Sequence, residues 1–195
     1  METITKYTVS IVSIGIYCML IIGNTEVFAV DGDGVKNAAL KQNNKQAWLS
    51  KGDALNRVGN FSEAIIAYDA ALMIDPNYVN AWDGKGWSLN ELGNYTQAIP
   101  YLDKALKIDP NYKWSLSNIG WSLNELGNYT QAIPYLDKAL KIDPNHVDGL
   151  VFKSQALYNI GNYTGAKYYS DKAFGIDPES PALHRLPEVL VKELQ

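Results

Sequence analysis

Two histidines and one cysteine are the side chains of this 195-residue chain best suited to act as bases, nucleophiles or metal ligands. His146 and His184 lie in different segments, and the single Cys18 lies in an apolar stretch far before both of them. An active site or a metal site needs two or three such groups to converge. We therefore predict that both histidines are surface residues and that the chain has no catalytic residues, no metal site and no cofactor.

Carboxylates occur in two patterns that could bind a cation. Asp31-Gly32-Asp33-Gly34 has the alternation of a calcium loop, but Val35 stands where such a loop needs an oxygen ligand, and no glutamate closes it. The other pattern is a row of aspartates in helical segments, which is typical of a solvated helix face. The row consists of Asp69, Asp103, Asp137 and Asp171. Neither pattern predicts a site, and we interpret the first as a linker.

The elements that carry these residues repeat every 34 positions. Each copy ends in Ile-Asp-Pro, first at Ile74-Asp75-Pro76, and contains an earlier Gly-Asn-aromatic-Ser/Thr motif, first at Gly59-Asn60-Phe61-Ser62. Glycine and proline interrupt helices, and between the two motifs the apolar residues recur at helical spacing. Each copy therefore predicts helix, turn, helix, turn, and a fixed period of this length indicates stacked units.

These features resemble the tetratricopeptide repeat family. The resemblance rests on Trp48 and Trp82, on the turn glycines 59, 93, 127 and 161, on two rows of alanines and on the closing prolines; Leu116 and Leu150 depart from it where the first two copies have Trp. It implies an all-α fold, a right-handed α-solenoid of four repeats with a C-terminal capping helix. The segments would be 1–29 (signal peptide or signal anchor), 30–44 (linker or N-terminal cap), 45–78, 79–112, 113–146 and 147–180 (the repeats) and 181–195 (the cap helix). The repeated Gly-Asn-Tyr-Thr phrase also resembles tetratricopeptide proteins of methanogenic archaea.

Helix ends can be predicted from capping residues. Pro100 and Pro134 would be tolerated best if Thr96 and its equivalent cap the second helices, or if the helix kinks there. Asn60 and Glu63 form a capping-box-like pair, so the second helix of the first repeat would begin earlier than in the other repeats. We also predict a short helix over residues 38–41 and a final helix beginning near Pro187.

The first 29 residues have the composition of an export signal. Residues 7–23 carry no charge, Lys6 precedes them, and Val27-Phe28-Ala29 fits a signal peptidase site. We favour cleavage after Ala29, and the alternative is an uncleaved anchor, because the apolar run is near the lower limit for a membrane span. Both alternatives place the repeats outside the cell or on its surface.

The resemblance also implies a concave groove lined by the first helix of each repeat, which holds an extended peptide. We predict that asparagines 56, 90 and 124 offer their amides to the main chain of a ligand and that Trp87 and Trp121 form apolar walls. An alternative remains open, in which both tryptophans pack in the core. The predicted groove consists of Asp53, Asn56, Asp83, Trp87, Asn90, Trp114, Asn118, Trp121, Asn124, Phe152, Gln155 and Tyr158.

Four asparagines head the pattern Asn-x-Ser/Thr, namely Asn60, Asn94, Asn128 and Asn162. In an exported protein they are candidate N-glycosylation sites. The alternative is purely structural, because asparagine is also an ordinary residue at a helix start.

Two functions agree with these observations. The first is a non-enzymatic adaptor, exported or membrane-tethered through residues 7–23, that binds a protein or peptide. The second is a structural spacer or self-associating envelope component. The formal charge is −4 from 17 basic and 21 acidic residues, without a basic stripe, which argues against a nucleic acid partner.

Overall fold

A computed structural model describes the backbone of residues 34–194 and the side chains of residues 44–192. Every regular element in this range is a helix. The elements are α1 (Gly34–Arg57), α2 (Phe61–Ile74), α3 (Val79–Glu91), α4 (Tyr95–Ile108), α5 (Lys113–Glu125), α6 (Tyr129–Ile142), α7 (Val147–Asn159), α8 (Tyr163–Ile176), the 3-10 helix η1 (Pro181–Arg185) and α9 (Glu188–Leu194).

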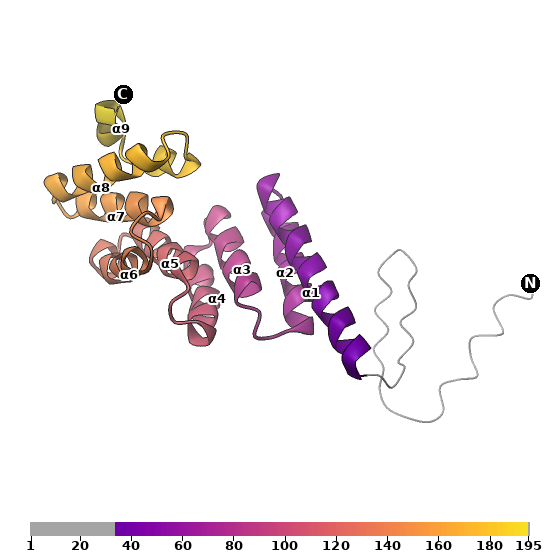
Figure 1. Ribbon diagram of the computed structural model, residues 1–195. Coiled ribbons are helices and arrows are strands. Elements are labelled where there is room, and N and C mark those ends of the chain that lie inside the picture. Colours follow the sequence, from indigo (N-terminus) through magenta and orange to yellow (C-terminus); the bar gives the residue numbers. More distant parts are fainter. Residues whose placement is uncertain (1–33, 195) are drawn as a thin grey trace, which may run out of the picture. The chain divides into compact units, whose positions relative to one another are not determined.

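The helices pack in consecutive antiparallel pairs, from α1 with α2 to α7 with α8 (Figure 1). Each pair also contacts the next, because α2 packs on α3, α4 on α5 and α6 on α7, and the first helices α1, α3, α5 and α7 contact one another in order. This arrangement confirms the predicted all-α solenoid of helix-turn-helix repeats. A single pair buries too little apolar surface to be stable alone, so each repeat completes its core on its neighbours.

The turn inside each repeat requires glycine. Gly59, Gly93, Gly127 and Gly161 have φ between 76° and 86°, in the left-handed region where a Cβ atom is unfavourable. The following asparagine N–H closes the turn, as when Asn94 donates to the carbonyl of Leu89 at 2.8 Å. At the other end, the aspartate of each Ile-Asp-Pro motif is extended, as a residue before proline prefers.

Small residues set how closely the two helices of a repeat approach. A Cβ atom at Gly86 would lie 2.5 Å from the Cγ of Leu102, and Gly120 has the same relation to Leu136. The fourth repeat carries Ser154 at this position, and the residue equivalent to Leu102 is there the smaller Ser170. The larger side chain of Ser154 is therefore accommodated because the facing helix carries the smaller side chain of Ser170.

Three predictions about helix ends are wrong. Asn94, not Thr96, is the N-cap of α4, so Pro100 lies inside the helix at its sixth position. The second helix of the first repeat starts after Asn60, in phase with the others, and the Asn60 side chain makes no capping hydrogen bond. Residues 38–41 are helical, as predicted, but they do not form a separate short helix; they belong to the continuous helix α1, which begins at Gly34 in the segment predicted as a linker or N-terminal cap.

The C-terminal helix is confirmed. It begins at Glu188, directly after Pro187, whose carbonyl accepts from the N–H of Leu190 at 2.9 Å. The 3-10 helix η1 before it was not predicted. Its residues Ala182 and Leu183 are buried, and η1 packs on α7 and α8.

Candidate functional site

The predicted groove lies on the first helices α1, α3, α5 and α7, but the structure divides its residues by exposure. Asp53 and Trp114 are exposed, and five others are partly buried, namely Asn56, Asp83, Trp87, Gln155 and Tyr158. The remaining five are buried, namely Asn90, Asn118, Trp121, Asn124 and Phe152. The surface open to a ligand is therefore narrower than the sequence predicted.

The asparagine row, which consists of Asn56, Asn90 and Asn124, joins neighbouring repeats. Asn90 is 1% exposed; its amide donates to the carbonyl of Asn118 at 3.0 Å, and its oxygen accepts from the hydroxyl of Ser122 at 2.7 Å. In the repeat before, the Asn56 oxygen accepts from the hydroxyl of Ser88 at 2.8 Å. The prediction that these amides face a peptide is wrong for Asn90, because α5 pairs with both its amide and its oxygen, and the Asn56 amide donates instead to the hydroxyl of Tyr68 at 2.8 Å.

The third member of the row lacks one partner. The amide of Asn124 donates to the carbonyl of Phe152 at 2.8 Å, but its oxygen is buried and has no partner among the described residues. The serine position of the next repeat is here Ala156, which has no hydroxyl to donate. One missing donor therefore explains the unpaired oxygen.

We expect Ala156→Ser to stabilise the protein by about 0.5–1.5 kcal/mol, because it adds the hydrogen bond that Ser122 makes one repeat earlier. The measurement is the free energy of unfolding from urea denaturation. Ala54→Ser is the matched control, since residue 54 holds the same repeat position but is exposed and has no asparagine row before it. A gain that is equal in both variants would contradict the missing donor.

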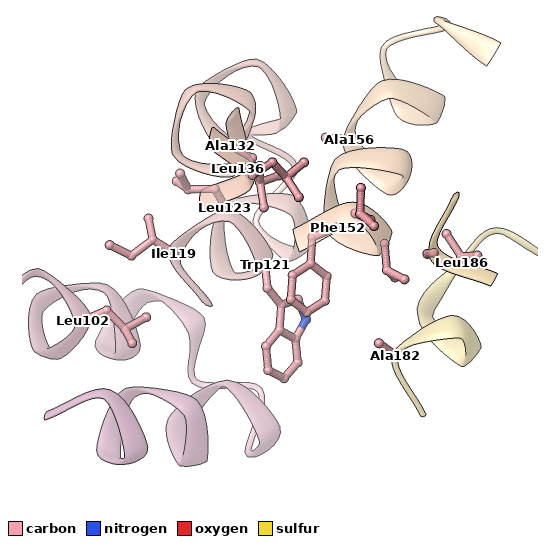
Figure 2. Close-up of a cluster of buried hydrophobic side chains, with 14 of the residues drawn as sticks. Leu102, Ile119, Trp121, Leu123, Ala132, Leu136, Phe152, Ala156, Ala182 and Leu186 are labelled. Carbon is pink, nitrogen blue, oxygen red and sulfur yellow. The ribbon is translucent and has the colours of Figure 1, made fainter. Parts of the chain in front are cut away.

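Trp121 is a core residue. It is 2% exposed, and its ring stacks on Phe152 with centroids 5.5 Å apart and an interplanar angle of 10° (Figure 2). The ring of Tyr95 approaches its edge at 6.2 Å. The prediction of an open apolar wall is therefore wrong for Trp121, and the core alternative is right. Trp87 is partly buried against the edge of Phe61.

An acidic cluster occupies the groove at the first two repeats. The hydroxyl of Tyr68 donates to Asp53 at 2.8 Å, and Asp83 accepts from Ser115 at 2.8 Å and from Asn118 at 3.1 Å. Burial raises the pKa of Asp83 to about 6, although the two hydrogen bonds act in the opposite direction. Burial and the Asp53 carboxylate also raise the pKa of Tyr68. Asp53 and Asp83 are thus hydrogen-bond acceptors for side chains of α2 and α5.

The other half of the groove is covered by the chain itself. Ala182, Leu183 and Leu186 belong to the same buried cluster as Trp121 and Phe152. Figure 2 shows Ala182 and Leu186 on the C-terminal segment, across from the stacked rings. Arg185 of this segment donates to Glu91 on α3 at 2.6 Å. A contact across 94 residues leaves no local signal in the sequence, which is why it was missed.

His146 is buried, so the prediction of a surface histidine is wrong there; His184 is exposed, as predicted. His146 Nε2 lies 2.9 Å from the hydroxyl of Ser117, and its ring meets Trp114 edge-on. Ser117 is itself 1% exposed and donates to the carbonyls of Lys113 and Trp114. The Ser117–His146 pair is thus closed to a substrate and links α5 to the start of α7.

The described residues contain no cluster of three or more metal-ligating side chains. None of the helices in that part of the chain combines the length and apolar composition needed to cross a bilayer. The predicted signal segment 1–29, Cys18 and the loop beginning at Asp31 lie outside the described residues. The asparagines of the four Asn-x-Ser/Thr motifs are all exposed N-cap residues, and Asn162 accepts from the N–H of Gly165.

Three models of the tetratricopeptide repeat family match residues 37–79, 79–145 and 123–186. A search of curated proteins gave no significant match. Among solved structures, MamA from Desulfovibrio magneticus RS-1 is 22% identical, with a TM-score of 0.61, over 77% of this chain and 85% of that chain. A thermophilic tetratricopeptide repeat protein of Thermus thermophilus is 18% identical, with a TM-score of 0.67, over 77% and 82%.

An O-GlcNAc transferase mutant of Thermobaculum terrenum is also similar, at 24% identity and a TM-score of 0.65, over 72% of this chain but only 28% of that chain. These three likenesses concern the fold, because each identity is below 25%. The repeat fold thus also occurs within an enzyme.

Proposed function

The chain belongs to the tetratricopeptide repeat family, and from that premise we propose that it is a non-enzymatic scaffold that binds a segment of a partner protein along its first helices. The observation that carries this function is the chain's own C-terminal segment. This segment is buried against Trp121 and Phe152 through residues 182, 183 and 186, so this surface accommodates a short peptide segment.

The open half of the groove supplies the contacts for a partner. Asp53 and Trp114 are exposed, and Trp114 is 42% accessible although it packs on His146. An exposed aromatic ring is a typical anchor at a protein interface. The carboxylates of Asp53 and Asp83 favour a partner segment with basic side chains.

Photo-crosslinking tests this function. The photoreactive residue benzoylphenylalanine replaces Trp114 in the groove or, as the control, Val58 in the turn after α1, which is 70% exposed. In extract of the source cells we expect one defined crosslinked partner from position 114 and none from position 58. Equal crosslinking from both positions, or none from position 114, would contradict a groove-bound partner.

We also propose that the repeats act outside the cell, released or held by residues 7–23. The uncharged run in that segment and the exposure of the four candidate glycosylation asparagines support this location. Mass spectrometry of native protein decides the matter. A chain that begins after Ala29, or a full chain in the membrane fraction, is expected, and a full-length chain in the cytoplasmic fraction contradicts export.

Self-association is a second candidate, favoured by apolar side chains on the second helices. Ile66, Met73 and Tyr168 are each more than half exposed, on α2 and α8. Light scattering across a range of concentrations distinguishes the two functions: a scaffold for another protein stays monomeric, whereas a self-associating component grows in mass.

A further inference from the structure

Arg185 binds to the groove in a way that defines a small subsite. Its guanidinium carbon lies 4.1 Å from the ring centroid of Trp121, and its Nη2 lies 2.6 Å from Oε1 of Glu91. Trp121 is on α5 and Glu91 on α3, so the cation bridges two repeats. A guanidinium combines both contacts well, because its flat face stacks on an aromatic ring while its N–H groups donate to a carboxylate in the plane of the guanidinium.

The surroundings of this cation are acidic and partly closed. The side chain of Glu91 is 18% exposed and that of Arg185 is 33% exposed. Burial raises the pKa of Asp148 at the start of α7, and Arg185 acts in the opposite direction. Glu91 and Asp148 are therefore carboxylates with restricted hydration. Removing Arg185 would take away the ion-pair partner of Glu91 and the positive charge that favours the ionised form of Asp148.

The segment that delivers Arg185 is weakly built. The element η1 is one short 3-10 helix, which has poorer hydrogen-bond geometry than an α-helix; Pro181 is its first residue, and Pro187 follows its C-cap Leu186. Besides the contacts of Arg185 with α3 and α5, η1 packs on α7 and α8 within the described part of the chain, and α9 after it has seven residues. The segment contributes three buried apolar residues, Ala182, Leu183 and Leu186, and it follows the last repeat, so its detachment breaks no contact between the repeats themselves.

We propose that Glu91 and Trp121 form a guanidinium-binding subsite, occupied by the chain's own Arg185 in the closed form and entered by an arginine side chain of the partner protein when residues 180–187 detach. This inference rests on the proposed function and names the chemistry of the partner. The C-terminal segment competes for the subsite, so the affinity for the partner is reduced by the fraction of molecules that are closed.

The test uses a labelled synthetic peptide with the sequence of residues 179–188, together with a second peptide in which alanine replaces its arginine. Fluorescence anisotropy measures the binding of each to the full chain, to Arg185→Met and to Arg185→Met with Glu91→Gln. Methionine keeps an unbranched apolar stem over Trp121 but removes the charge. We expect Arg185→Met to bind the arginine peptide about tenfold more tightly than the wild-type chain does.

The arginine preference should depend on the carboxylate. We expect Arg185→Met to bind the arginine peptide more tightly than the alanine peptide, and Glu91→Gln to remove this difference. Equal affinity for the two peptides, an unchanged affinity after Glu91→Gln, or no binding to Arg185→Met would each overturn the subsite. Far-UV circular dichroism verifies folding, and Arg185→Gln replaces Arg185→Met if that variant does not fold.

The peptide-binding test of the subsite and the crosslinking test of the scaffold function can fail independently of each other. If the peptides show no arginine preference but position 114 still crosslinks a partner, the subsite is rejected and the scaffold function stands. If position 114 crosslinks nothing while the arginine peptide behaves as expected, the subsite stands as an internal contact that accepts a guanidinium, and the partner-binding function is rejected.

Discussion

Trp121→Ala lowers the free energy of unfolding by about 3–5 kcal/mol, the usual cost of truncating a large buried aromatic residue. The ring is 2% exposed, stacks on Phe152 and contacts the Arg185 guanidinium, so its loss opens a cavity where three repeats meet. Because repeats are stabilised mainly by their neighbours, the effect should spread to the fourth repeat and the C-terminal segment. Urea denaturation followed by circular dichroism measures it.

Trp114→Ala is the matched control for this truncation. It removes the same side chain seven residues earlier on the same helix, but that ring is 42% exposed. We expect a cost of about 1 kcal/mol, from its contact with His146. If the two variants lose equal stability, Trp121 is not the core residue described above.

The second large effect is a dependence of stability on pH that comes from His146. Burial, with a smaller contribution from Lys113, lowers its pKa to about 4 from an ordinary 6.5. Between these values the unfolded chain takes up a proton that the folded chain does not, so stability falls as the pH falls. The full loss from this group is about 3 kcal/mol by pH 4.

Asp83 acts in the opposite direction over almost the same range. Its pKa is raised to about 6 from 3.8, so below pH 6 the folded chain takes up the proton first, and stability rises as the pH falls toward 3.8. In the wild-type chain the two groups partly cancel. Asp83→Asn removes the gain, and we expect a steeper loss between pH 6.5 and pH 4 than in the wild-type chain.

His146→Gln is the complementary variant and should show a shallower loss than the wild-type chain. The measured quantity is the difference in the free energy of unfolding between each variant and the wild-type chain at each pH, which cancels the titration of the other carboxylates. Two differences that stay flat from pH 7 to pH 4 would show that neither group titrates abnormally in the folded chain.

The local pattern was sufficient to predict the repeats. Gly93 and Pro110 mark the two turns of the second repeat. Gly93 does so because it readily adopts a left-handed φ, and Pro110 because it lacks the backbone N–H that a helix needs. The alanine rows predicted close packing because their period matches the helix and the repeat. The cap of α4 was missed because both Asn94 and Thr96 can occupy such a position, and the helix accepts Pro100 in its interior.

Spacing within 34 residues was therefore enough to predict the helices and their order, whereas the face on which we propose a binding surface was implied by the family resemblance. Which residues of that face are available follows from the packing of distant parts of the chain. The side-chain oxygen of Asn90 accepts a hydrogen bond from Ser122 of the next repeat, and the guanidinium of Arg185 from the C-terminal segment lies over the ring of Trp121. Both outcomes depend on contacts between residues distant in the chain, and burial is a property of the packed molecule that no local pattern contains.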